Sequence, residues 1–201
     1  MTLPRAVPLL GLLLAGCATA PQGPPPGPPP VSVFISPAGE PFRPDAGSPP
    51  PVARWRAQVD ADHDGVVTRE ELAKDFDRFF TLLDVEKDDS LIGPELTRYE
   101  REIAPEILIG AGMPPMQRPS TGTSAKRRRA EAAAIRQGAA MFGLLNDPQP
   151  VMSADADLNR RVTRAEFARK AGLVFGRLDR NGDGKLTADE LELPGAGGPG
   201  R

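Results

Sequence analysis

The sequence has few of the side chains on which most catalytic centres and soft-metal sites depend. It contains one cysteine, Cys17, and one histidine, His63. A single cysteine excludes a disulfide within one molecule, and a single histidine excludes a histidine-rich zinc site. The sequence also shows no serine–histidine–aspartate set and no glycine-rich phosphate loop. We therefore expect a binding protein rather than an enzyme.

The sequence also has almost no excess of one charge sign over the other, and it has no long apolar run. The formal net charge of the 201 residues is −2, so the chain as a whole has no strong electrostatic signature for nucleic acid. The apolar run near the N-terminus, residues 7–14, is shorter than the roughly 20 residues that a transmembrane helix needs. Because Arg5 precedes this run, we interpret residues 1–16 as a signal peptide.

Residues 14–17, Leu-Ala-Gly-Cys, resemble the lipobox of bacterial lipoproteins. The resemblance implies cleavage before Cys17 and acylation of its thiol, which supplies the acyl chains that stable membrane anchoring requires. Ala18 follows the cysteine in place of an acidic residue, which favours the outer membrane. The expected location is the bacterial cell envelope, with the protein facing the periplasm. An ordinary secretory signal cut near residues 18–20 is the alternative.

Proline dominates residues 17–51, which follow the signal. Such a segment favours extended polyproline II, so we expect a disordered tether between the membrane and a folded domain. Residues 31–35, Val-Ser-Val-Phe-Ile, interrupt it with apolar and β-branched side chains. They are either a short strand that docks on the domain or an apolar spot in a disordered linker.

An acidic twelve-residue pattern occurs four times in the chain. Loop 1 (residues 60–71) and loop 4 (residues 179–190) have oxygen side chains at positions 1, 3 and 5, glycine at position 6 and glutamate at position 12. Loop 2 (residues 84–95) and loop 3 (residues 155–166) are poorer copies. A hard cation of high coordination number needs such oxygens around a tight turn, so the pattern predicts Ca2+ as the bound ion.

These loops resemble those of the EF-hand superfamily, which implies an all-α, EF-hand-like helix–loop–helix domain. The overall layout, lipobox included, also resembles uncharacterised exported EF-hand proteins of alphaproteobacteria. Carried over by position, the resemblance implies these ligands in loops 1 and 4: Asp60, Asp62, Asp64, Val66 (carbonyl), Thr68 and Glu71, and Asp179, Asn181, Asp183, Lys185 (carbonyl), Thr187 and Glu190. In loops 2 and 3 it implies Asp84, Glu86, Asp88, Ser90 (carbonyl) and Glu95, and Asp155, Asp157, Asn159, Arg161 (carbonyl), Thr163 and Glu166.

Loops 2 and 3 depart from the family pattern at position 6, where loops 1 and 4 have glycine. Asp89 takes this place in loop 2 and Arg160 in loop 3, and both should be strained there because the backbone needs positive φ. Arg160 also adds a positive charge beside the ion, and Ile92 at position 9 of loop 2 supplies no side-chain oxygen. We expect loops 1 and 4 to be the principal sites, and occupancy of loops 2 and 3 is open.

The loops form two pairs that are copies of each other, 95 residues apart. We expect an entering helix over residues 52–59, a helix over residues 69–83 and an exit helix over residues 96–109. In the last of these, Pro105 either permits the full helix or kinks or ends it. Because only twelve residues separate loops 1 and 2, one helix about 18 Å long joins them and holds them at opposite ends. The fold is then two duplicated loop–helix–loop units whose loops pair across the units, strong with weak. This arrangement favours a metal-braced domain over an opening switch.

The remaining segments complete the expected organisation. The two loop pairs occupy residues 52–112 and 151–193, and a linker (113–123) and a basic, alanine-rich segment (124–150) lie between them. A disordered tail follows at 194–201. We expect a helix over residues 124–145, and four basic residues near its start are the candidate site for an anionic envelope partner: Lys126, Arg127, Arg128 and Arg129. A solvated helix end is the alternative interpretation of this cluster.

The sequence thus predicts Ca2+ binding by an exported, lipid-anchored protein in which the metal stabilises the domain. One alternative is a Ca2+-regulated adaptor that binds an envelope partner through its basic helix. The least favoured alternative is a hydrolase that uses a pair of carboxylates.

Overall fold

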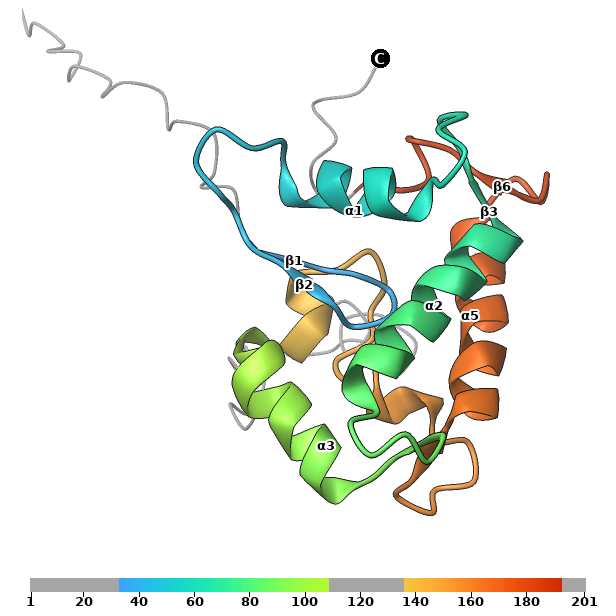
Figure 1. The fold of residues 1–201 in the computed structure, drawn as a ribbon. Helices are drawn as coiled ribbons and strands as arrows, with labels where there is room; N and C mark the ends of the chain where they lie inside the picture. The colour runs from blue at the N-terminus through green and yellow to red at the C-terminus, as the bar shows by residue number, and fades with distance from the viewer. Residues whose placement is uncertain (1–32, 109–135, 193–201) are drawn as a thin grey trace, which may run out of the picture. The chain divides into compact units, whose positions relative to one another are not determined.

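The computed structural model describes residues 33–108 and 136–192 (Figure 1). The chain divides into two compact units, Met1–Pro30 and Val31–Arg201, and every described residue lies in the second. The predicted signal peptide, Cys17, the linker, the basic cluster at 126–129 and the tail at 194–201 lie outside the described residues. Within the described segments, no helix is both long enough and apolar enough to cross a membrane.

Helices alternate with the acidic loops in both copies. The first copy contains α1 (Pro51–Val59), β3 (Val67–Thr68), α2 (Arg69–Leu83), β4 (Ser90–Leu91) and α3 (Gly93–Arg98). The second copy contains a 3-10 turn (Met152–Ala154), β5 (Val162–Thr163), α5 (Arg164–Leu178) and β6 (Lys185–Leu186). The helices predicted over residues 52–59 and 69–83 are confirmed as α1 and α2.

The exit helix predicted over residues 96–109 ends before Pro105, which is the alternative in which this proline ends the helix. It begins earlier, as α3, and continues through a π-helical turn at Tyr99–Ile103. Ala104 leaves the helical conformation, with φ −126° and ψ 57°, and Pro105 begins a separate 3-10 turn that ends at Leu108. Proline disfavours the helical conformation in the residue before it, which accounts for the break.

Helices α2 and α5 begin in the same way because their sequences repeat the same capping box. The Thr68 hydroxyl accepts a hydrogen bond from the Glu71 N–H, and the Glu71 carboxylate accepts one from the Thr68 N–H. Thr163 and Glu166 make the equivalent pair at the start of α5. These caps satisfy amide groups that the first helical turn leaves free. Each loop therefore leads directly into its helix.

The core lies between α2 and α5, which pack side by side (Figure 1). Phe167 of α5 is the centre of this contact, with its ring 5.1 Å from that of Phe76 and 5.7 Å from that of Phe80. All three side chains are buried. The two helices run antiparallel, because β3 and β6 pair at one end and β4 and β5 pair at the other.

Residues 33–42 form a β-hairpin that belongs to the folded unit. Strands β1 (Phe34–Ile35) and β2 (Pro41–Phe42) pair antiparallel, and Phe34 and Ile35 are each 1% exposed. The Phe34 ring lies 5.4 Å from that of Trp55 in α1. For the described part of residues 31–35, residues 33–35, the docked strand is thus the correct alternative. The disordered tether predicted over 17–51 is wrong from residue 33 onward, because burial of these apolar side chains fixes the segment.

Polar contacts also attach the hairpin to α2. Arg78 of α2 forms ion pairs with Glu40 of the hairpin turn and with Asp75, whose carboxylate is 2.8 Å from the guanidinium. Asp75 also accepts a hydrogen bond from the Trp55 indole N–H at 3.1 Å, so the buried indole has its partner. The hairpin, α1 and α2 are therefore held together by one polar network.

The helix predicted over residues 124–145 is wrong over its described part. Residues 136 and 137 are not helical, and only a 3-10 turn, Gly138–Met141, follows. Gly138 has φ +55°, which an α-helix does not accommodate. The Phe142 carbonyl, in turn, accepts a hydrogen bond from the Ile35 N–H at 2.9 Å. Tertiary contacts have overridden the helix propensity of the alanine-rich sequence here.

Replacing Gly138 with alanine should destabilise the fold by about 3 kcal/mol. A Cβ at this position would collide with the Pro148 carbonyl oxygen and lie 3.1 Å from that of Ile107. Gly47 is the matched control, because it also has positive φ (+82°) but no atom within 4 Å of the point that a Cβ would occupy. Gly47→Ala should cost about 1 kcal/mol in urea unfolding. Equal losses in the two variants would contradict the assigned close approach at Gly138.

Candidate metal centres

Loop 1 folds around its own carboxylates. Asp60 at position 1 accepts hydrogen bonds from the N–H groups of Asp64 (3.1 Å) and Gly65 (3.0 Å). Asp62 accepts a second bond from the Asp64 N–H at 3.2 Å, and Asp64 accepts one from the Val66 N–H at 3.0 Å. Side-chain bonds of this kind hold a short loop in one turn. The predicted ligands at positions 1, 3 and 5 are therefore held by their own backbone.

Glu71 at position 12 closes loop 1 from the first turn of α2. One carboxylate oxygen accepts a hydrogen bond from the Ala61 N–H and the other accepts one from the Thr68 N–H, both at 2.9 Å. Burial raises the pKa of Glu71, but the hydrogen bonds from Thr68 and Ala61 outweigh it and the net shift is downward. The carboxylate is consequently ionised and presents both oxygens, as a bidentate Ca2+ ligand must.

The same arrangement recurs at position 12 of loops 3 and 4. The pKa values of Glu166 and Glu190 are lowered chiefly by the hydrogen bonds that they accept from the N–H groups of Thr163 and Thr187. In loop 2, Glu95 accepts hydrogen bonds from the N–H groups of Val85 (2.8 Å) and Ile92 (3.1 Å). In all four loops, position 12 bonds the N–H groups of positions 2 and 9.

Carboxylates from opposite ends of the loop converge in loops 1 and 3. Each set contains the side chains at positions 1, 3 and 12, and in each set the candidate ligand oxygens lie within 4.8 Å of one another: Asp60, Asp62 and Glu71, and Asp155, Asp157 and Glu166. Oxygens that share one Ca2+ lie no further apart than about 4.8 Å, because each Ca–O bond is about 2.4 Å long. The geometry therefore suits a single Ca2+ ion.

Loops 2 and 3 have the same backbone conformation as loops 1 and 4 despite their different residues at position 6. Asp89 and Arg160 have φ +61° and +66°, where Gly65 and Gly184 have +87° and +78°. Asp84 accepts hydrogen bonds from the N–H groups of positions 5 and 6, as Asp60 and Asp155 do in loops 1 and 3, whereas Asp179 of loop 4 accepts them from positions 4 and 6. The structure thus confirms positive φ at position 6 without glycine. The replacement of glycine does not distort loops 2 and 3, because the hydrogen bonds hold the turn.

The other predicted ligand residues lie in the same turns. Ser90 donates its hydroxyl to Asp88 at 2.8 Å, and Asn159 donates its amide to Asp157 at 2.9 Å. In loop 4, Asn181 donates to Asp183 at 3.0 Å. Glu86 and Arg161 are exposed, as are Asp183 and Lys185. His63, at position 4 of loop 1, is also exposed.

The loops pair between the two copies, as predicted, but with different partners. Val67 of loop 1 pairs with Leu186 of loop 4, and Leu91 of loop 2 pairs with Val162 of loop 3. The predicted pairing of strong with weak loops is therefore wrong. Pairing of strong with weak loops requires parallel helices. The antiparallel packing of α2 and α5 instead brings the two glycine-bearing loops, 1 and 4, together at one end. Figure 1 shows β3 and β6 side by side at that end.

A buried ion pair supports loop 3, which the sequence leaves with too few preceding residues for an entering helix. Lys170 of α5 donates to the Asp147 carboxylate (2.8 Å), the Ser153 hydroxyl (2.7 Å) and the Pro150 carbonyl. Burial raises the pKa of Asp147, but the charge and hydrogen bond of Lys170 together with hydrogen bonds from Ser153 and Gln149 outweigh it, so the net shift is downward. Sequence reasoning missed this pair. The only available signal was that Lys170 replaces Asp75 in the duplicated copy.

Replacing Lys170 with methionine should destabilise the protein by about 3 kcal/mol, because Asp147 is then left largely buried without its cation. Thermal unfolding in EDTA measures the loss. The double variant Lys170→Met with Asp147→Leu should regain stability relative to the single variant. No loss in the single variant would show that the pair does not support the segment before loop 3.

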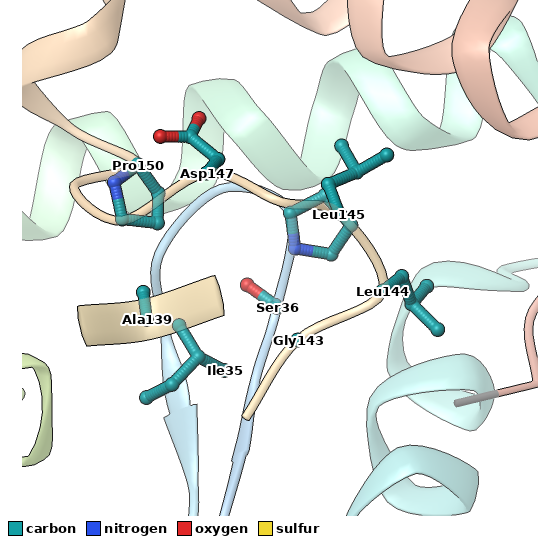
Figure 2. Close-up of a pocket in the computed structure, with 9 residues that line it drawn as sticks. Ile35, Ser36, Ala139, Gly143, Leu144, Leu145, Asp147 and Pro150 are labelled. Atoms are coloured by element: carbon teal, nitrogen blue, oxygen red, sulfur yellow. The ribbon is translucent and has the colours of Figure 1, made fainter. Parts of the chain in front are cut away.

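A small cavity lies beside this segment, between the hairpin and residues 139–150. It has a volume of about 10 Å3, and its wall includes Ile35, Ser36, Asp147 and Pro150 (Figure 2). Such a space holds about one water molecule. It is a small gap between the hairpin and the segment that precedes the second copy, and it is far too small for an organic ligand.

Comparison with known proteins identifies two segments of the chain. Residues 57–77 and residues 173–193 each match the family model of the EF hand. The first match covers loop 1 and the second covers loop 4, which are the two loops with glycine at position 6. No curated protein shows a significant match to the chain.

Proposed function

Because the chain belongs to the EF-hand calcium-binding superfamily, we propose that it binds Ca2+ to brace its fold. The observation that carries this proposal is the pairing of loops from different copies at the two ends of α2 and α5. An ion in each loop neutralises carboxylates that otherwise repel one another, and the paired loops join helices that are far apart in sequence. Calcium then stabilises the arrangement of the two copies.

The position of α2 supports a structural role for calcium over a switch. Because α2 leaves loop 1 and enters loop 2, it cannot rotate to open one site without moving the other. The core-facing apolar side chains of α2 are also covered. Phe34 and Ile35 of the hairpin are buried in the same cluster as Phe76 and Phe79. A sensor needs an apolar groove that calcium exposes, and here part of the chain already fills the core.

A fluorescence titration with an apolar dye distinguishes the brace from the regulated adaptor. With the full-length protein, dye fluorescence should stay constant or fall as Ca2+ is added in place of EDTA, since the metal tightens the fold. A rise in fluorescence on Ca2+ binding indicates newly exposed apolar surface and would favour the adaptor. Mg2+ at the same concentration is the control for a general effect of divalent charge.

Export and lipid anchoring are part of the same proposal, and they rest on the Leu-Ala-Gly-Cys sequence. Acyl labelling in a bacterial host should require Cys17, and Cys17→Ser should release the protein from the membrane fraction. Thr19→Ser, a nearby change that keeps the cysteine, is the matched control. Labelling that persists in the Cys17→Ser variant would show that this residue is not the anchor.

A further inference from the structure

We propose that Arg164 acts as a built-in cation that holds loops 2 and 3 together and weakens Ca2+ binding at loop 2. This inference rests on the proposed function, because it concerns whether the carboxylates at each end of the domain are neutralised by Ca2+ or by a side chain. Arg164 would thus determine the Ca2+ affinity of loop 2 although it does not belong to loop 2.

Arg164, the first residue of α5, lies across the boundary between loops 2 and 3. Its backbone N–H donates to the Asp89 carbonyl at 3.0 Å, and its Nε donates to the Asp89 carboxylate at 2.6 Å. Its Nη1 pairs with Asp77 of α2. The guanidinium carbon lies 4.6 Å from the centre of the Phe80 ring. Several independent contacts therefore fix this side chain, although it is 34% exposed.

The fixed guanidinium lies close to the first ligand of loop 2. Its Nη2 atom is 3.8 Å from the Oδ2 atom of Asp84, a carboxylate that is almost completely buried. Asp84 occupies position 1, where the family pattern places a direct Ca2+ ligand. A unit positive charge at this distance stabilises the ionised loop in the absence of metal. The same charge repels a divalent ion that enters the loop.

The duplication provides an internal comparison, because Arg69 is the equivalent of Arg164 at the other end. The Arg69 guanidinium lies 4.7 Å from the centre of the Phe175 ring, and its Nη1 donates to the Gly172 carbonyl at 3.4 Å. Gly172 and Gly184 stand where the first copy has Asp77 and Asp89. The ring contact is thus common to both ends, while the acidic partners exist only beside loop 2.

The two ends of the domain consequently differ in their need for metal. Loop 2 carries four acidic residues at ligand positions and a fifth, Asp89, at position 6, and Arg164 offsets part of this charge without any ion. At the other end, the acidic partners are replaced by glycines, so Arg69 makes no equivalent clamp. We expect loops 2 and 3 to be held together before Ca2+ binds, and loops 1 and 4 to depend on Ca2+.

Two substitutions distinguish the effect of the Arg164 charge from the effect of its packing. Arg164→Gln removes the cation and should raise the Ca2+ affinity of loop 2 by about tenfold, which is what one screened charge acting on a divalent ion supplies. The same variant should unfold at a temperature about 3 °C or more lower in EDTA. Arg164→Lys keeps the charge and should keep wild-type affinity while losing some stability. A residue with only a packing role cannot raise affinity while lowering stability.

The test is calorimetric Ca2+ titration of the full-length protein with melting curves in EDTA. Arg69→Gln is the matched control and should change the affinity less than threefold. The gain in Arg164→Gln should vanish when Glu95→Gln removes the position-12 ligand of loop 2. If the unsubstituted protein binds no Ca2+, the proposed function fails. If it binds but Arg164→Gln leaves the affinity unchanged or lowers it, only the role of Arg164 is overturned.

Discussion

Replacing Glu71 with glutamine is expected to lower the Ca2+ affinity of loop 1 by about 100-fold or more. Glu71 is the position-12 residue whose two oxygens face the loop, and a neutral amide supplies one oxygen in place of a charged pair. The apo protein should lose only a little stability, because glutamine keeps the N3 bond to the Thr68 N–H of the capping box and loses only the bond from the Ala61 N–H. The substitution therefore separates metal binding from helix capping.

Calorimetric titration of the full-length protein measures this loss as a missing binding event. Glu70→Gln is the matched control, because Glu70 is adjacent, exposed and equally charged. The loss of Ca2+ binding at loop 1 in Glu71→Gln should also lower the Ca2+ affinity of loop 4, because Val67 of loop 1 pairs directly with Leu186 of loop 4. An unchanged affinity in Glu71→Gln would show that loop 1 is not a Ca2+ site of the family type.

Replacing Phe34 with alanine is expected to cost about 4 kcal/mol of stability. The Phe34 side chain is 1% exposed, and its ring contacts both the Trp55 ring and the Phe42 ring, at 5.4 Å and 6.3 Å between centres. Its removal leaves a cavity between the hairpin and α1. The loss should be similar with and without Ca2+, because the rings that the Phe34 ring contacts, Trp55 and Phe42, belong to α1 and β2 and not to a loop.

Urea unfolding measured in EDTA and again in Ca2+ tests this prediction. Leu173→Ala is the control: this α5 side chain is 61% exposed, so its truncation should change stability by less than about 0.5 kcal/mol. A loss below about 1 kcal/mol in Phe34→Ala would contradict the docked hairpin. Such a result would indicate that residues 33–42 belong to the disordered tether predicted over residues 17–51.

The local elements could be predicted because each is encoded by neighbouring residues. The twelve-residue loops, the capping pair Thr68 and Glu71, and the apolar face of α2 all depend on positions within one or two turns. The sharing of α2 between two loops followed from the short interval between them. These features needed no knowledge of distant contacts.

The pairing of the loops and the fate of the flanking segments depend on distant contacts. Loop spacing places two loops at opposite ends of a helix, but it does not distinguish parallel from antiparallel packing of α2 against α5. That choice is set by contacts such as Phe167 with Phe76 and by the charges that Arg164 shares with loop 2. Residues 33–42 and 136–145 likewise take their conformations from each other, through the Ile35–Phe142 hydrogen bond.

The most direct test of the metal brace is the melting temperature of the full-length protein in millimolar Ca2+ and in EDTA. Ligand that binds only the folded state stabilises it in proportion to the logarithm of its concentration over its dissociation constant. With paired loops at both ends, we predict a rise of about 10 °C or more in Ca2+ and a much smaller rise in Mg2+. Identical melting curves in Ca2+ and EDTA would contradict the account.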